Sequence, residues 1–400
     1  MLRITVSTSG RAATAYFNAE LSRGDYYAEK GELAGIWQGR GAALLGLEGQ
    51  VVEREAFAAL ASNRDPTTGE QLTPRLKDNR RAGYDFTFSA PKSVSVLREY
   101  LLETGREAQA AELVAGFERA VGDSMAELEA DMRVRLRAKG QRGDAVTGTM
   151  VWAGFTHFQS RPVDGWADPH LHRHAFAMNL THDGTGWKAG EFGAIKRDAV
   201  YYQEAFHARL AAELKGQGYD VEASARDFEL AGIGRETVAK FSRRTAEVEA
   251  DAKNRGVQSE GLKSTLGART RAQKDEGLPA EETRARNMAR LSETERQAFE
   301  RLASREDEPP PAMTAREGVD YAIAHVFERQ STCDEKRLAA EALKAGAGAY
   351  GPEQVWRELQ GRADVLRARV GDRSTVTTRA ALEEEATMLR LAQDGRGQAI

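Results

Sequence analysis

An α+β fold is predicted from three observations on the 400-residue sequence. β-rich runs with a two-residue alternation are spread through the first half of the chain, and helical patterns separate them. Beyond Gly234 nearly every segment is helical and strongly charged, so the sheet is expected to end there. Because 41% of the residues are hydrophobic, the chain can build a sizeable core in two or three domains.

The elements are expected in a definite order. They are a strand over residues 2–8, a helix that contains Tyr16, a strand over 83–89, a helix from about 92 to 135, strands over 146–158 and 171–181, a short strand within 184–192, a helix over 195–215 and a hairpin over 218–232.

The first elements are justified by alternation and by turn residues. The run LRITVST is β-rich, and a Ser-Gly pair ends it before the helix with Tyr16. In the run GYDFTFS, Asp85, Thr87 and Ser89 share one face and aromatic residues share the other. The polar face can therefore hold a site. A Ser-Ala-Pro-Lys segment then has the features of a helix start.

The later elements follow from the same signals. The runs 146–158 and 171–181 are β-rich, and the Gly/Pro/Asp-containing segment RPVDGWADP separates them. We therefore expect them to be antiparallel neighbours joined by a loop. The segment GYDVEASARDFELAG has the pattern of a hairpin.

One domain boundary is predicted at residues 305–313, where a charge run meets three prolines. Residues 1–304 are expected to form the main domain, with its sheet-containing part reaching about 234 and a charged helical lobe over 235–304. Residues 314–400 show short amphipathic patterns and stop without an obvious cap, which suggests a fragment of a longer protein.

Composition excludes several classes of protein. A formal net charge of −4 argues against a protein that simply coats nucleic acid, so any DNA site must be a local patch. The single Cys333 leaves no intramolecular disulfide framework. Because the chain has neither a signal-peptide core nor a run of transmembrane length, we expect a cytoplasmic protein.

Four of the seven histidines lie within eighteen positions. On a strand, His170, His172 and His174 share one face, where neutral imidazoles can bind a divalent metal. His170 and His174 would be roughly 13 Å apart, too far to share an ion, although adjacent members of the series can share one. His157 on the neighbouring strand is the available third ligand. A chance run of histidines on a polar strand is the alternative, and the clustering argues against it.

Three neutral imidazoles would leave the ion its full charge and an open coordination position. Such a site suits the polarisation of a phosphate. It could equally activate a water molecule, so the histidines alone do not separate a hydrolase from a strand transferase.

Tyr16, Tyr26 and Tyr27 are candidate nucleophiles, although tyrosines are more often ordinary core or surface aromatics. A phenol with a pKa of about 10 needs a nearby base or cation before it can attack. Asp85 and the metal can supply both. Asp85 is expected either to orient a metal-binding histidine or to accept the tyrosine proton, unless it is simply a solvent-facing carboxylate.

Several motifs together resemble those of the MobF-type conjugative relaxases, a branch of the histidine-hydrophobe-histidine (HUH) endonuclease superfamily. The similar segments are DYYAEKG, WQGRGAALLGLEG at 37–49, GYDFTFSAPKSVS at 83–95, FTHF at 155–158, DPHLHRHAFAMN at 168–179 and FSRRT at 241–245. The resemblance implies a palm with an antiparallel sheet of about five strands, flanked by helices and followed by a helical extension.

The resemblance also implies an activity and roles for residues. Tyr16 would attack DNA to form a 5′-phosphotyrosine, and Tyr26 or Tyr27 would serve a second transfer. The metal ligands would be His157, His172 and His174, with Mg²⁺ or Mn²⁺ as the expected ion, and His170 would be a bystander. Asp85 would help to deprotonate the tyrosine or to orient a ligand.

The expected substrate is single-stranded DNA beside a hairpin at a plasmid transfer origin, with relaxosome accessory proteins and a coupling protein as further partners. The basic residues expected to hold the strand are Arg75, Lys77, Arg80, Arg81 and Lys92, with a second run at Arg133, Arg135, Arg137 and Lys139.

Two features depart from the family pattern. Phe17 follows Tyr16 where some relatives carry a second tyrosine. The 400 residues also contain no GxxxxGK[ST] phosphate loop, although the resemblance implies a helicase downstream. Residues 314–400 would then lead into that missing helicase part. The rival functions are a replication initiator or transposase with HUH chemistry, and a non-catalytic module that binds single-stranded DNA or metal.

Overall fold

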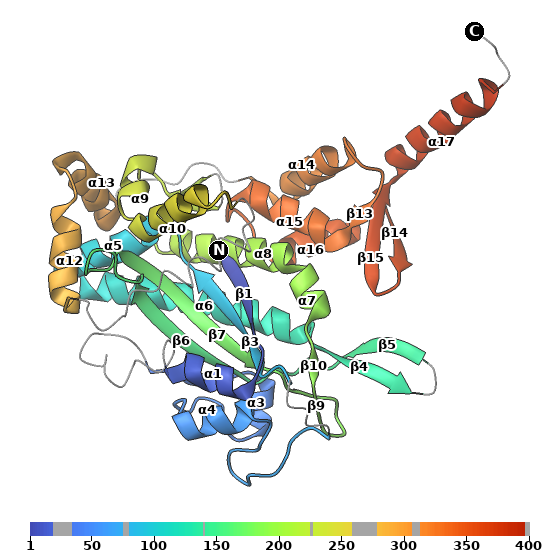
Figure 1. The fold of residues 1–400 in the computed structure, drawn as a ribbon. Helices are drawn as coiled ribbons and strands as arrows, with labels where there is room; N and C mark the ends of the chain where they lie inside the picture. Colours follow the sequence, from blue (N-terminus) through green and yellow to red (C-terminus); the bar gives the residue numbers. More distant parts are fainter. Residues whose placement is uncertain are drawn as a thin grey trace.

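A five-stranded antiparallel sheet forms the centre of the protein (Figure 1). The computed structural model describes residues 1–18, 34–74, 80–138, 141–224, 227–257, 278–305 and 313–396. The strands, in their order across the sheet, are β1 (Leu2–Ser7), β3 (Gly83–Ser89), β7 (Pro169–Met178), β6 (Trp152–Gln159) and β2 (Ile36–Gln38). The sheet of about five strands expected from the sequence is confirmed, although β2 was not predicted.

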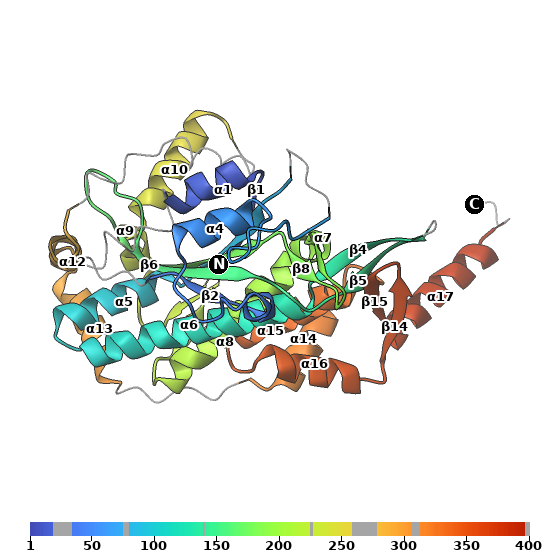
Figure 2. The same cartoon turned by 90° about the horizontal axis from the view of Figure 1, so that it is seen from below.

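Helices cover both faces of this sheet (Figure 2). On one face lie α1 (Gly10–Tyr16) and α4 (Arg54–Ala61), over a core that includes Phe57 and Phe176. On the other face lie the longer helices α5 (Lys92–Glu103), α6 (Glu107–Ala130) and α8 (Ala199–Gly216). The short helix α3 (Arg40–Leu44) lies beside the edge strand β2, and the backbone N–H of Arg40 donates to Glu129.

The alternation along β3 assigns its side chains to these two faces as predicted. Phe86 and Phe88 are fully buried, and the ring of Phe88 lies 5.0 Å from that of Phe206 on α8. Asp85 and Thr87 point to the opposite face, toward α1. The strand therefore contributes aromatic residues to one core and polar residues to a site on the other side.

The prediction of one long helix from about 92 to 135 is wrong in two places. It is broken between α5 and α6 at Gly105, whose φ of +74° favours glycine and ends a helix. Its last residues instead form a hairpin of β4 (Arg133–Ala138) and β5 (Gln141–Val146), which projects from the body (Figure 1). The alternating run RVRLRA suits a strand, and β6 consequently starts later than expected.

The remaining elements before the predicted boundary are short. They are β8 (Thr181–His182), β9 (Trp187–Lys188), β10 (Gly190–Glu191), α7 (Gly193–Arg197), β11 (Val221–Ala223), β12 (Phe228–Leu230), α9 (Arg235–Lys240), α10 (Arg243–Asn254), α12 (Ala280–Ala289) and α13 (Glu293–Ser304). The pairing of β11 with β12 confirms the hairpin predicted over 218–232. In the described residues beyond 234, this lobe is helical, as expected.

The C-terminal part is mainly helical, as predicted, but also contains a small sheet that was not. Its elements are α14 (Ala315–Phe327), β13 (Cys333–Asp334), α15 (Glu335–Gly346), α16 (Pro352–Gly361), β14 (Val365–Val370), β15 (Arg373–Thr378) and α17 (Arg379–Asp394). The β14–β15 hairpin turns at Gly371, with φ at +66°. The two strands carry many charged residues, and this charge pattern is also typical of the solvent-exposed face of a helix.

Residues on both sides of the predicted boundary contribute to one hydrophobic core. Leu338 and Leu343 of α15 belong to the same cluster as Tyr201 and Leu210 of α8. Lys336 also donates to Asp131 at 2.6 Å. Most of the segment 305–313 lies outside the described residues, so the division into domains stays a prediction. No helix within the described ranges has the length and apolarity needed to cross a membrane.

Candidate active site

Three histidines from two neighbouring strands meet on the face of the sheet that α1 covers. In the antiparallel pair of β6 and β7, His157 lies directly opposite His172, and His174 follows two residues later on the same face. The ring centroids are 5.4 Å apart for His157 and His172, 5.5 Å for His157 and His174, and 5.3 Å for His172 and His174. The rings thus form a nearly equilateral triangle.

The spacing and chemistry of this triangle fit a divalent metal. Rings that bind one ion through nitrogens at about 2.1 Å, in tetrahedral directions, have centroids about 5 Å apart. The Nδ1 atom of His172 lies 2.8 Å from the carbonyl oxygen of His170, and Nδ1 of His174 lies 2.8 Å from Oδ2 of Asp85. These contacts orient the rings and leave the Nε2 atoms as ligands.

No group of three or more His, Cys, Asp or Glu side chains within the described part of the chain already has the arrangement that holds an ion.

His170 has a different position from the other three histidines. Its ring stacks on that of His172, with centroids 4.3 Å apart and an angle of 16° between the planes. Burial lowers the pKa of His170 well below its ordinary value, and the nearby Lys92 lowers it further. Burial also lowers the pKa of His172, and the surrounding histidines add to the shift. Both imidazoles are therefore neutral at pH 7.

The metal-free protein should become less stable as the pH falls from 7 to about 5.5. The unfolded chain protonates His170 and His172 near pH 6.5, whereas the folded chain keeps them neutral, so the unfolded state binds more protons. Each of the two histidines therefore lowers the free energy of unfolding further as the pH falls below about 6.5. Urea unfolding in the presence of a chelator measures this difference. His170→Gln should remove about half of the histidine contribution, and an unchanged pH dependence in that variant would contradict the assignment.

Tyr16 lies at the end of α1, beside the three histidines. The helix begins where the side chain of Ser9 accepts a hydrogen bond from the backbone N–H of Ala12 at 3.1 Å. The helix ends at Tyr16. The Tyr16 hydroxyl donates to Oδ2 of Asp85 at 2.7 Å and lies 3.2 Å from Nδ1 of His174. The predicted nucleophile, acid and metal-binding histidine are thus in direct contact.

Asp85 is buried at the centre of these contacts, with 3% of its surface exposed. Besides Tyr16 and His174, its Oδ2 atom accepts a hydrogen bond from the hydroxyl of Thr87 at 3.2 Å. Burial alone would raise the pKa of this carboxyl group, but His174, Tyr16 and Thr87 together hold it below the ordinary value. Asp85 is therefore an ionised acceptor.

The structure describes only part of the predicted DNA-contacting set. Of the predicted DNA-contacting residues, Arg75, Lys77 and Lys139 lie outside the described residues, as do the candidate nucleophiles Tyr26 and Tyr27.

The described members of the set contact protein groups. Arg80 donates to the carbonyl of Asn179 at 2.6 Å, and burial lowers its pKa to about 10. Arg81 donates to the hydroxyl of Tyr84 at 3.3 Å. Lys92 donates to the carbonyl of Pro169 at 2.6 Å, and burial lowers its pKa to about 8. Their role in DNA binding stays a prediction.

The sequence did not assign a role to Asp168 or Arg243. Both lie in segments that carry the family resemblance, which was the available signal, but they are 75 residues apart and nothing local indicates that they pair. In the structure Arg243 Nε donates to Asp168 Oδ1 at 2.9 Å.

Solved structures with a similar fold include relaxases bound to DNA. One is described as the conjugative relaxase TrwC in complex with OriT DNA in a copper-bound state. It is 30% identical with a TM-score of 0.62, over 74% of this chain and 98% of that one. Another is TrwC complexed with a 27-mer DNA comprising the recognition hairpin and the cleavage site. It is 29% identical with a TM-score of 0.58, over 74% of this chain and 98% of that one.

Sequence comparisons agree. The multifunctional conjugation protein TraI of Escherichia coli K12 is 31% identical over 217 residues, which are 50% of this chain and 12% of that protein. A second TraI of Escherichia coli is 30% identical over 244 residues, 56% of this chain and 13% of its own length. The chain therefore spans only about an eighth of these relatives. The family model of the TrwC relaxase matches residues 10–294, well over half of the chain, and the chain therefore belongs to the TrwC relaxase family, as its MobF-type motifs predicted.

Proposed function

We propose that this chain nicks one DNA strand at a plasmid transfer origin and becomes attached to the 5′ end through Tyr16, so that conjugative transfer can begin. The observation that carries the proposal is the contact of the Tyr16 hydroxyl with both Asp85 and His174, beside the three-histidine triangle. The names of the relatives, a conjugation protein and relaxases bound to OriT DNA, support the same activity.

The reaction proposed for Tyr16 is an in-line attack on phosphorus. A bond forms between the phenolic oxygen and phosphorus, and the bond from phosphorus to the 3′ oxygen breaks, so that the upstream strand leaves with a 3′-hydroxyl. The phenol loses its proton to solvent and the departing 3′ oxygen takes up a proton from solvent, so no net proton is gained or lost. Because the phosphodiester is exchanged and not hydrolysed, the strand can be rejoined by the reverse reaction.

Asp85 fits the orienting role better than that of final base. A carboxylate with a lowered pKa is a weak base, so proton transfer to it from a phenol of pKa about 10 is unfavourable. Its short contacts instead align the Tyr16 hydroxyl and hold the tautomer of His174 that carries a proton on Nδ1. The deprotonated tyrosine would then lie beside the Nδ1–H of His174, whose Nε2 atom is the proposed metal ligand.

His157, His172 and His174 are the proposed metal ligands. A divalent ion bound there, with Mg²⁺ or Mn²⁺ as the first to test, would polarise the scissile phosphate and stabilise the phenolate. Metal-bound and metal-free TrwC structures support a metal site of this kind in the family.

The proposed substrate is single-stranded DNA beside a hairpin, because the DNA in one TrwC structure comprises a recognition hairpin and a cleavage site. Relaxosome accessory proteins and a coupling protein are proposed as further partners, and Tyr26 or Tyr27 as the nucleophile of a second transfer. The basic residues expected to hold the strand belong to the same proposal.

Formation of a covalent adduct tests the proposed function. With Mg²⁺ or Mn²⁺ and a labelled single strand that contains the nick site, the protein should become attached to the 5′ end of the downstream product, and the adduct should survive a denaturing gel. Cleavage without an adduct would indicate a water nucleophile, and binding without cleavage would indicate a non-catalytic module. Either result would contradict the proposal.

A further inference from the structure

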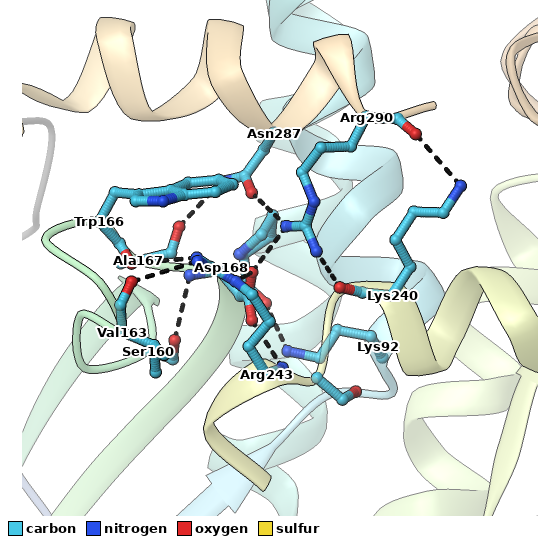
Figure 3. Close-up of polar contacts among 12 residues, drawn as sticks. Lys92, Ser160, Val163, Trp166, Ala167, Asp168, Lys240, Arg243, Asn287 and Arg290 are labelled. Carbon is cyan, nitrogen blue, oxygen red and sulfur yellow. Dashed lines mark hydrogen bonds and ion pairs between the residues drawn. The ribbon is translucent and has the colours of Figure 1, made fainter. Parts of the chain in front are cut away.

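An ion cluster around a buried carboxylate connects the turn between the two histidine strands to the helical lobe (Figure 3). We call it the Asp168 cluster, and it comprises Asp168, Arg243, Arg290, Asn287 and Trp166. The turn begins after β6, and Asp168 is its last residue before β7. With 2% of its surface exposed, Asp168 depends on protein groups to stabilise its charge.

Arg243, at the first position of α10, provides most of these groups. Its backbone N–H donates to Oδ2 of Asp168 at 2.8 Å and its Nε to Oδ1 at 2.9 Å. Its remaining nitrogens donate to the carbonyl oxygens of Val163 at 3.1 Å and Trp166 at 3.0 Å, and the guanidinium lies 3.6 Å from the centroid of the Trp166 ring. One side chain thus binds three residues of the turn.

The end of α12 contacts the turn from a second direction. Arg290, which follows the helix, donates from Nη1 to Oδ1 of Asp168 at 2.9 Å. The side-chain amide of Asn287 donates to the carbonyl of Ala167 at 2.9 Å. A single carboxylate therefore accepts hydrogen bonds from two arginines of the helical lobe.

The cluster is continuous with the metal-binding strand. The residue after Asp168 is Pro169, whose carbonyl accepts from Lys92 at 2.6 Å, and the carbonyl of the next residue, His170, contacts Nδ1 of His172. His172, a proposed ligand, therefore lies only four residues after Asp168. Between them, the carbonyl groups of Pro169 and His170 each contact a side chain.

We propose that Asp168 is a positioning residue for the metal site, through which Arg243 and Arg290 fix the start of β7 and hence the direction of His172. This inference rests on the proposed function, since it takes His172 to be a ligand. Without the carboxylate, the two partly buried guanidinium groups and the nearby Lys92 would repel one another, and we expect the turn to move. The FSRRT segment, which includes Arg243, then has a role at the metal site although it contacts no ligand.

Metal binding in the absence of DNA tests the proposal. Titration of the full chain with Co²⁺ alone, followed by its visible absorption, reports both affinity and ligand geometry. Asp168→Asn keeps the size of the side chain and removes its charge, and we expect it to weaken Co²⁺ binding by roughly 10-fold and to alter the absorption band. Arg243→Lys keeps the charge but loses the planar fork, so it should weaken binding in the same direction.

Two control variants separate positioning from general stability. Arg286→Gln removes an exposed arginine of α12 that pairs with Glu282 and should leave Co²⁺ binding unchanged. Leu359→Ala lowers stability by opening a cavity in the C-terminal core and should also leave the Co²⁺ affinity unchanged at temperatures where the protein is folded.

Each outcome decides the question. If Asp168→Asn or Arg243→Lys folds and binds Co²⁺ as the wild type does, the positioning role is overturned. If Asp168→Asn fails to fold, Arg243→Lys and Arg290→Gln give the answer by the same measurement. If the wild type itself binds no Co²⁺, Mg²⁺ or Mn²⁺, the metal site of the proposed function fails instead, which is a distinguishable result.

Discussion

Tyr16→Phe should abolish the covalent adduct with DNA, lowering its rate of formation by at least about 10³-fold. The substitution keeps the aromatic ring and removes only the hydroxyl that contacts Asp85 and His174. Folding and binding of single-stranded DNA should therefore persist. The measurement is the yield of adduct with a labelled strand on a denaturing gel, together with a binding titration on the same strand.

Tyr321→Phe is the matched control, because this tyrosine is half exposed on α14 and stacks on His325, away from the site. It should form the adduct at the wild-type rate. If the adduct survives in Tyr16→Phe and disappears in Tyr26→Phe or Tyr27→Phe, Tyr16 is not the principal nucleophile, although the mechanism stands.

His172→Ala should abolish cleavage and lower metal affinity by at least about 100-fold, whereas His170→Ala should have a far smaller effect. His172 is one corner of the ring triangle, opposite His157 across the strand pair. His170 contributes a stacked ring and a backbone carbonyl, and alanine keeps the carbonyl. Metal content after dialysis and the yield of adduct measure the two effects.

His182→Ala is a suitable control for this pair, since His182 lies on β8 and packs against Trp187. It should retain both metal and activity. Equal losses in His170→Ala and His172→Ala would refute the assignment of ligands.

The side chains that share a face in the candidate site could be predicted from the sequence, because strand periodicity decides which side chains lie together; their roles stay a prediction. The two-residue alternation placed Asp85 and Thr87 on one face of β3, and His172 and His174 on one face of β7. The loop between the two β-rich runs indicated that His157 would come from the neighbouring strand. The exact register, with His157 opposite His172, depends on the whole sheet and was not predictable.

Features set by single backbone positions or by long-range pairs escaped prediction. The break at Gly105 depends on a positive φ that the helical pattern on either side does not reveal. The β14–β15 hairpin carries charges at positions that also suit a helix face. The Asp168 cluster joins residues 75 and 122 positions apart, and no local propensity encodes such a contact.

The shared packing of α8 and α15 has a consequence for how the chain should be divided for expression. A product that stopped at residue 304 would leave the aromatic side of α8 in water, because Trp356 of α16 donates to the hydroxyl of Tyr201 at 2.6 Å and Lys336 lies over the ring of Tyr202. It would also leave Arg197 without its 2.8 Å ion pair to Asp372. Residues 314–378 therefore cover a surface of α8 that a shorter product would expose to water.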